Sequence, residues 1–405
     1  MAVKGKSITI LGAGIGGLTA AIALARRGAR VTVLEQAPEA TEVGAGIQIT
    51  PNGTAVFEAL DLGPRLAKIG MPLTAVELRD YRRGDLILQM DMTKPKHANP
   101  NPYLLVHRAD LIELLAHSAK RHGISLLFGK QATGVAIGFD QATLPMNDGP
   151  QRNTKYLIGA DGLRSLTRQA LNRRKKPDFT GQVAWRATVE ARYLPLYDVP
   201  PVATVYMGPN RHLVTYPLRD GRLINIVAVE QRDAWAAEGW QNQDDPAHLQ
   251  AAFADWAPEL RKLLKLCEDA HLWGLFSHPV AEVWSQGGTA ILGDACHPTL
   301  PFLAQGANMA IEDAWVLAEE MDRHDNSQDA FAAYRARRFK RVSRIVRASK
   351  GNTRIYHLAP GPLRFGAHLG MKIANRIAPG KFAARYNWLY GHDVTKDGQG
   401  LGTAK

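Results

Sequence analysis

The sequence predicts an α/β fold in which a Rossmann-like domain is interrupted by an antiparallel β-sheet and followed by a helical C-terminal region. Three observations predict it. The first 35 residues have the order strand, glycine turn, helix, strand. Between about residues 182 and 229 the apolar pattern changes to a period of two. Near residues 288–321 the pattern returns to a strand followed by a helix. A chain of 405 residues is long enough for two interlocked domains.

The N-terminal unit begins with an apolar strand at residues 7–11 (SITIL). The turn GAGIGG and a helix closed by Gly28 follow, and a second strand, RVTVLE, ends at Glu35. A crossover of this kind joins parallel strands. Residues 7–25 are almost free of charge, but their four glycines fit a strand, turn and helix rather than a signal peptide or a membrane span. We therefore expect no stable membrane insertion.

The remaining elements divide the chain into three parts. A helix is expected at residues 108–122 and a strand at 156–160, whereas four period-two segments point to the inserted sheet. We expect a discontinuous dinucleotide-binding domain, a substrate domain, and a C-terminal helical extension that covers the core or mediates a dimer. The first domain comprises residues 1–75, 100–180 and 280–350. The substrate domain comprises residues 76–99 and 181–279, and the C-terminal extension comprises residues 351–405.

Composition excludes several other classes of protein. The only two cysteines, Cys267 and Cys296, cannot form a disulfide framework, and no His/Cys cluster predicts a metal site. This favours a cytoplasmic protein.

The net charge is +12, with basic runs at residues 173–176 and 335–350 that we expect to be a solvated loop and helix face. No nucleic-acid-binding module is present, but a positive field attracts anionic substrates and dinucleotides.

The first candidate binding site is the GxGxxG turn with the acid that ends the next strand. Glycines allow the tight turn and the close approach of a pyrophosphate, which then lies at the N-terminus of the helix. Glu35 is placed to accept hydrogen bonds from the adenosine ribose, with Gln36 beside it. The residues assigned to this site are Gly12, Gly14, Ile15, Gly16, Gly17, Glu35 and Gln36.

Two further turns follow predicted strands. One is Gly159-Ala160-Asp161-Gly162, and the other is Gly293-Asp294-Ala295 followed by Gln305-Gly306-Ala307-Asn308. A carboxylate at Asp294 suits a ribityl hydroxyl of a flavin. The amides after Gly306 can face the pyrimidine edge of the flavin and stabilise negative charge there.

Taken in order, GAGIGG…E, HRADL, GADGLRS and GDACHPTLPFLAQGANMAIEDA resemble the single-component FAD-dependent aromatic hydroxylases. This family includes salicylate hydroxylase, 3-hydroxybenzoate 6-hydroxylase and 6-hydroxynicotinate 3-monooxygenase, and the resemblance covers about residues 7–350. It implies an oxidoreductase of aromatic-compound catabolism that uses FAD, O₂ and transient NADH or NADPH. Its substrate would be a small phenolic or hydroxy-heteroaromatic acid, hydroxylated through a flavin C4a-hydroperoxide. The protein would be a monomer or a homodimer.

The resemblance also implies roles for individual residues. Arg108 would contact an FAD phosphate or ribose, and Asp161 would support both FAD and the nicotinamide site. Asp294 would bind the ribityl chain or the pyrophosphate. Gln48 would lie beside the flavin on the substrate side, where some relatives carry a histidine base, so the base here stays open. Adenine would meet the backbone at Ala132 or Val135, and the isoalloxazine would meet Ala307 and Asn308.

The inserted sheet carries the candidate catalytic residues. Alternation places His212, Val214 and Tyr216 on one face of a strand. The resemblance implies that such a histidine and tyrosine bind and deprotonate the ring hydroxyl, with the pKa of His212 near neutrality. Gln305 is a second polar candidate, and the backbone at Pro301 would flank the flavin.

The sequence leaves two alternatives open. One is an FAD monooxygenase of a non-benzoate substrate such as urate or a quinone precursor, and the other is a flavin-binding redox sensor that hydroxylates nothing. The choice of aromatic acid, the loss of a carboxyl group and the choice between NADH and NADPH also stay open.

Overall fold

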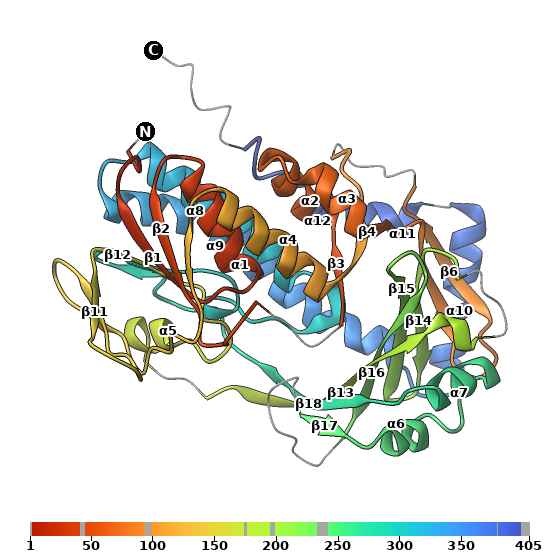
Figure 1. Cartoon of the computed structure of the whole chain (residues 1–405). Coiled ribbons are helices and arrows are strands. Elements are labelled where there is room, and N and C mark those ends of the chain that lie inside the picture. Colours follow the sequence, from red (N-terminus) through yellow and green to blue (C-terminus); the bar gives the residue numbers. More distant parts are fainter. Residues whose placement is uncertain are drawn as a thin grey trace.

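The computed structural model describes residues 2–40, 45–93, 99–173, 176–194, 199–232, 242–378 and 380–397 (Figure 1). A six-stranded sheet has the order β19-β20-β12-β1-β2-β8. Strand β1 pairs in parallel with β2 and β12, and β12 pairs in parallel with β20. The turns after β1, β12 and β20 therefore leave the same edge of the sheet, where α/β folds bind ligands. The strands are β1 (Ser7–Leu11), β2 (Arg30–Leu34), β8 (Ser125–Leu127), β12 (Tyr156–Gly159), β19 (Ser285–Gln286) and β20 (Thr289–Ile291).

Helix α1 (Ile15–Ala25) explains the charge-free N-terminal stretch. It packs against α4 (Arg108–Arg121), α8 (Gly306–Arg323) and β2, so nearly all its residues are buried. A helix covered on all sides is apolar all round. No helix in the described parts of the chain is both long enough and apolar enough to cross a bilayer.

The second large sheet has eight strands in the order β17-β18-β13-β16-β15-β14-β5-β6. Its pairs are antiparallel except for the parallel pair of β14 with β5. The helices α6 (Pro246–Ala252) and α7 (Pro258–Lys265) form a core with one face of this sheet around Trp185, Leu213 and Trp256. The strands are β5 (Ala75–Asp80), β6 (Leu86–Asp91), β13 (Asp178–Glu190), β14 (Val202–Gly208), β15 (Arg211–Leu218), β16 (Leu223–Gln231), β17 (Gln243–Asp244) and β18 (Ala270–Ser277).

Smaller elements complete the fold, most of them in the N-terminal half of the chain. Two three-stranded sheets have the orders β3-β7-β4 and β11-β10-β9. Their strands are β3 (Gly46–Ile49), β4 (Gly70–Pro72), β7 (Leu104–His107), β9 (Ala136–Ile137), β10 (Ala142–Leu144) and β11 (Arg152–Thr154). The short helices are α2 (Pro51–Ala59), α3 (Gly63–Ile69), α5 (Leu166–Leu171), and the 3₁₀ turns η1 (Ala191–Tyr193), η2 (Gly293–Ala295) and η3 (Pro301–Leu303).

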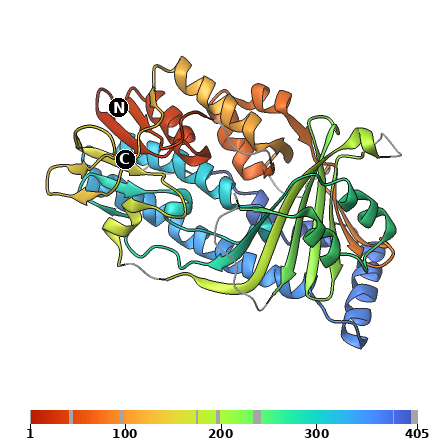
Figure 2. The same ribbon diagram turned by 60° about the horizontal axis from the view of Figure 1, so that its bottom comes forward.

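The C-terminal part is helical, as predicted. Helix α9 (Ser327–Tyr356) contacts β19 of the six-stranded sheet and β14 of the eight-stranded sheet, so it links the two sheets (Figure 2). Helix α10 (Pro362–Ile377) packs on β6. The short helices α11 (Lys381–Ala384) and α12 (Asn387–Tyr390) follow. The predicted fold class is thus confirmed.

The interpretation of residues 335–350 as a solvated basic face is wrong for part of α9. Arg338 is fully buried, and its guanidinium lies 2.7 Å from Asp313 and 2.5 Å from Glu312 of α8. Arg341 also pairs with Glu312, at 2.8 Å. Carboxylates on the facing helix allow these arginines to point inward, which local periodicity cannot show. In the other basic run, residues 174 and 175 lie outside the described part of the chain.

Candidate active site

One cavity of about 410 Å³ lies between the two large sheets, and both contribute to its walls. The turns of the six-stranded sheet contribute Gly14, Asp294 and Gly306. The eight-stranded sheet contributes His212 and Tyr216, which are four residues apart on the alternating face predicted for β15. The cavity therefore joins the predicted cofactor-binding turns to the predicted catalytic strand.

The glycine turn fits the pyrophosphate of a dinucleotide. Gly12 has φ +107°, and a Cβ there would overlap the carbonyl oxygen of Ala160. A Cβ at Gly17 would overlap the carbonyl oxygen of Gly12, so helix and turn pack closely. By contrast, a Cβ at Gly14 would meet nothing within 4 Å, and Gly14 lines the cavity at the start of α1 together with Ile15 and Gly16. This open backbone at a helix N-terminus is suited to phosphate.

Glu35 lies at the end of β2, where the sequence places it. Its carboxylate accepts hydrogen bonds from the backbone N–H of Ala13 at 2.7 Å and of Ala37 at 2.9 Å. Gln36 is exposed. The side chain of Glu35 is thus held against the glycine turn, and its contact with a ribose stays a prediction.

The third turn places Asp294 and the N-terminus of α8 at the cavity. Gly293 has φ +60°, and Asp294 is exposed to the cavity that it lines. Gly306 and Ala307 begin α8 and also line the cavity, so their free N–H groups lie at its wall. Arg108, the first residue of α4, is another lining residue, and its charge acts on Asp294.

Asp313 on α8 forms hydrogen bonds that fix the conformation of this turn. The sequence had not indicated a role for Asp313 at the site. One carboxylate oxygen accepts from the N–H of Gly293 at 3.1 Å and lies 2.5 Å from Nε2 of His297. The other accepts from Nε of Arg338 at 2.7 Å. Burial opposes the charged form, but His297 and Arg338 more than offset it, and the pKa of Asp313 lies below its ordinary value. The only signal in the sequence was the pair of acids Glu312 and Asp313 within the mostly apolar first two thirds of the helix.

Several of the predicted cofactor residues lie outside the cavity wall, among them Ala132, Val135 and Asp161. Asp161 accepts hydrogen bonds from Ser165 Oγ at 2.5 Å and from the Thr167 N–H at 3.0 Å, so its carboxylate caps the start of α5. Ala132 and Val135 belong to a small apolar cluster beside the ends of β1 and β2. Contacts of these residues with FAD stay predictions.

Gln48 lies among the polar side chains of the substrate side. Tyr103 donates to Gln48 Oε1 at 2.6 Å, and all three of Gln48, Tyr103 and Tyr216 line the cavity. Burial raises the pKa of Tyr216 to about 12, against smaller lowering effects of Arg186 and of a hydrogen bond with Gln48. Tyr216 therefore carries its proton at neutral pH and can donate it to a ligand. Gln48 itself cannot act as a base.

His212 is buried and forms a hydrogen bond that the sequence did not predict. Its Nδ1 lies 2.7 Å from Nε2 of His357, which follows α9. Burial, and then the neighbouring His357, lower the pKa of His212 well below its ordinary value. The expectation of a pKa near neutrality is therefore wrong. A neutral imidazole with Nδ1 occupied leaves Nε2 for a ligand.

Gln305 and Asn308 are tied to α2 and β3. Gln305 accepts from Asn52 Nδ2 at 3.1 Å and donates to Thr50 Oγ1 at 3.0 Å. Asn308 donates to the backbone oxygen of Gln48 at 2.9 Å, so its side chain binds protein rather than facing the cavity. Gln305 and Pro301 both line the cavity. The structure therefore brings all four predicted catalytic residues to one cavity, and their roles stay predictions.

Arg186 on β13 is the most informative residue that the sequence analysis missed. It lines the cavity, and its guanidinium lies 5.5 Å from the ring of Trp273 on β18. Alternation along β13 turns Trp185 into the core on the other side of the sheet. The available signal was an arginine within the mostly apolar stretch 183–189 of this strand. Tyr386 and Tyr390 also reach the cavity, from the C-terminal segment.

Comparisons with known proteins agree with this geometry. Residues 6–349 match the model of a family described as FAD binding domain. The chain is 35% identical to 3-amino-4-hydroxybenzoate 2-monooxygenase of Streptomyces platensis, over 96% of this chain and 97% of the relative. It is 33% identical to 3-hydroxybenzoate 6-hydroxylase of Polaromonas naphthalenivorans, over 96% of each protein.

A solved structure of Klebsiella pneumoniae HpxO with FAD and uric acid superposes with a TM-score of 0.79 at 26% identity, covering 92% of this chain and 94% of that one. Together these matches span nearly the whole chain, including both sheets and the cavity between them. The chain therefore belongs to the FAD binding domain family, among its FAD-dependent monooxygenases.

Proposed function

We propose that this enzyme hydroxylates a small phenolic or hydroxy-heteroaromatic acid, with O₂ and with NADH or NADPH as co-substrates. The observation that carries the proposal is the cavity in which Asp294 and the N-termini of α1 and α8 face Arg186, His212 and Tyr216. The names of two relatives, which act on hydroxybenzoates, support an aromatic acid.

We further propose that the six-stranded sheet belongs to the FAD-binding domain and the eight-stranded sheet to the substrate domain, with the ranges expected from the sequence.

Bound FAD would accept electrons from the nicotinamide and activate oxygen. The residues of the chain would bind and orient the substrate. Arg186 would hold its carboxylate through paired N–H groups, which suit a planar anion. Tyr216 would donate to the ring hydroxyl, and neutral His212 would accept the hydroxyl proton at Nε2. Apolar walls that include Val227 and Phe302 would exclude water.

The depressed pKa of His212 limits its role as a base. A phenol has a much higher pKa than a buried imidazole, so complete proton transfer in the resting complex is unfavourable. Proton transfer becomes favourable only as the ring gives up electron density to oxygen, when the hydroxyl becomes more acidic. We therefore propose that His212 takes the proton during the hydroxylation step, not before it.

The test is a panel of hydroxybenzoates and hydroxynicotinates, scored by ligand-stimulated oxidation of NADH and NADPH and by product analysis. His212→Phe and Tyr216→Phe should keep bound FAD and lose most hydroxylation. Full turnover in both variants would reject the assignment of these two residues. Asp294→Ala should instead lower the FAD content of the purified protein.

A second candidate is a heterocyclic substrate of the urate type, because a solved relative binds uric acid together with FAD. Adding urate to the panel separates the two substrate classes.

We also propose a cytoplasmic location, which the two buried, unpaired cysteines support. The protein would be a monomer or a homodimer.

A further inference from the structure

Helix α10 presents an apolar face to solvent. Five large side chains on it are exposed: Leu363 (75%), Phe365 (70%), Leu369 (44%), Ile373 (48%) and Ile377 (77%). They recur at helical spacing along the side opposite to the one that packs on the protein. A surface helix of a globular protein normally turns polar residues outward, and a contiguous exposed apolar patch marks an interaction site.

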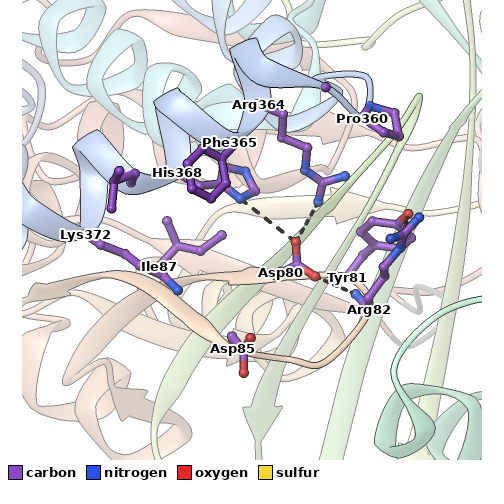
Figure 3. Close-up of a pocket in the computed structure, with 12 residues that line it drawn as sticks. Asp80, Tyr81, Arg82, Asp85, Ile87, Pro360, Arg364, Phe365, His368 and Lys372 are labelled. Atoms are coloured by element: carbon purple, nitrogen blue, oxygen red, sulfur yellow. Dashed lines mark hydrogen bonds and ion pairs between the residues drawn. The ribbon is translucent and has the colours of Figure 1, made fainter.

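The inner face of α10 is anchored by polar contacts, which fix the orientation of the outer face. Arg364 is buried and donates to Asp80 at 2.9 Å and to the backbone oxygen of Met207 at 2.9 Å. Figure 3 shows Arg364 and His368 reaching from the helix toward Asp80 at the end of β5, where the His368 ring lies 3.9 Å from the carboxylate. The guanidinium of Arg364 also lies 4.7 Å from the Tyr81 ring. Rotating α10 to bury its apolar side would break all these contacts.

The charges on α10 itself have one sign, although Asp80 and Asp85 line a pocket together with Phe365, Leu369 and Lys372. No aspartate or glutamate occurs between Asp329 and Asp393, so α10 and its neighbours in the sequence carry only cations. Lys372 and Arg376 are exposed on α10. At 100° per residue they fall beside Phe365 and Leu369, at one border of the apolar stripe. Exposed Lys381 and Arg385 follow the helix.

We propose that the outer face of α10 binds reversibly to the surface of an anionic phospholipid bilayer. The stripe Leu363–Ile377 would enter the boundary between headgroups and acyl chains, while Lys372 and Arg376 reach the lipid phosphates. Amphipathic helices with an apolar face bordered by cations bind membranes in this way. Long cationic side chains can lie along the apolar surface and keep their charge at the headgroups. A helix of 16 residues lies on a bilayer rather than crossing it.

A second copy of the chain fits this face less well. A helix pair made from two copies would place Lys372 and Arg376 of both beside one another, with no acid on either helix to pair with them. The outer face of one 16-residue helix also supplies fewer residues than the roughly 20–30 per side of a stable interface. An anionic surface satisfies the apolar stripe and the cations together.

The experiment is co-sedimentation of the FAD-loaded, full-length protein with vesicles of phosphatidylcholine alone or with added phosphatidylglycerol. The protein should bind the anionic vesicles, bind the neutral ones far less, and dissociate in about 0.5 M NaCl because salt screens the charges. Lys372→Glu and Arg376→Glu should each weaken binding about fivefold or more. Ile373→Asp should abolish binding while leaving FAD content and thermal unfolding unchanged.

The matched control is Phe139→Asp, which changes an equally apolar residue that is 99% exposed in the loop between β9 and β10. It should bind the anionic vesicles like the unchanged protein. No binding to anionic vesicles, equal binding to neutral ones, or unchanged binding of Ile373→Asp would overturn the proposal. It would also be overturned if sedimentation velocity without lipid showed a dimer that Ile373→Asp converts to a monomer.

Discussion

Tyr216 reaches the cavity because Gly46 has no side chain. A Cβ at Gly46 would overlap both the ring of Tyr216 and the amide of Asn225. The N–H of Gly46 also donates to Asn225 Oδ1 at 2.7 Å, which holds β3 against β16. Gln48, two residues further along β3, thereby reaches Tyr103 and Tyr216. The positions of the polar side chains of Gln48, Tyr103 and Tyr216 at the cavity thus depend on the absence of one methyl group at residue 46.

We predict that Gly46→Ala displaces Tyr216 and lowers kcat/KM about 10- to 100-fold, because small misplacements of substrate-positioning groups have effects of this size. The FAD content should not change, since Gly46 contacts the substrate side. Steady-state kinetics and the flavin absorbance measure both. Gly366→Ala on the outer face of α10, where a Cβ meets nothing within 4 Å, is the matched control. Wild-type kinetics of Gly46→Ala would show that Tyr216 need not occupy its observed position.

Arg186 gives a second prediction at the residue scale. Arg186→Met should raise KM for an aromatic acid about 10- to 100-fold, the usual effect of losing a hydrogen bond to a charged group. KM for the matching neutral amide should change little. Arg186→Lys should restore part of the affinity, since it keeps the charge but not the paired N–H groups. An equal loss for the acid and the amide would show that Arg186 supports the fold and does not bind the carboxylate.

Helices α8 and α9 stabilise the turn that carries Asp294. Asp313 on α8 connects the backbone of Gly293 and the ring of His297 to Arg338 on α9. Within this cluster the charges are compensated, so the pKa of Asp313 stays low although the carboxylate is fully buried. Removing the carboxylate of Asp313 would leave the ring of His297 without this partner and Arg338 with Glu312 alone, and breaking a buried pair in this way is strongly destabilising.

We predict that Asp313→Asn destabilises the protein by about 3–5 kcal/mol and weakens FAD binding. The Kd for FAD, measured by fluorescence titration below the unfolding temperature, separates the two effects. Glu319→Gln is the control on the same helix, because Glu319 pairs with Arg323 and Arg337 away from the turn. It should change stability slightly and leave the Kd for FAD unaltered. An Asp313→Asn protein with wild-type FAD affinity would contradict the role of this cluster.

The elements themselves could be predicted from the sequence, because their signals are local. The period of two along residues 212–218 predicted β15 and the shared face of His212 and Tyr216, and the glycine turn predicted the start of α1. Arg186, His357 and Asp313 could not be assigned, because each acts through a partner more than 20 residues away in the chain. The pKa of His212 depends on burial and on His357, and neither can be derived from a single strand.

At the scale of the whole molecule, the cavity joins three parts of the chain that lie far apart in the sequence. The six-stranded sheet supplies helix N-termini, the eight-stranded sheet supplies Arg186, His212 and Tyr216, and the C-terminal segment supplies Tyr386 and Tyr390. The contact of His212 with His357 ties the eight-stranded sheet to the end of α9. Both imidazoles are buried in neutral form, so protonation opposes this assembly.

The pH dependence of stability follows from that contact. Burial lowers the pKa of His357 from 6.5 to about 4. The unfolded chain therefore binds a proton below pH 6.5 that the folded chain does not, and stability is lost as the pH falls. His357 alone should remove about 2 kcal/mol between pH 7 and pH 5. Urea unfolding at both pH values measures the loss. His357→Gln should be less stable at pH 7 but show a smaller loss, and an unchanged loss would contradict the assignment.

If one cavity couples FAD chemistry to a phenolic acid held by the eight-stranded sheet, each nicotinamide oxidised should yield one hydroxylated product. The most direct test is the yield of hydroxylated product per NADH or NADPH oxidised, measured with the best substrate of the panel. We expect close to one product per nicotinamide for the unchanged enzyme. For Tyr216→Phe we expect a much lower ratio, with FAD still bound. Ligand-stimulated oxidation that yields only hydrogen peroxide in the unchanged enzyme, or full coupling in Tyr216→Phe, would contradict this expectation.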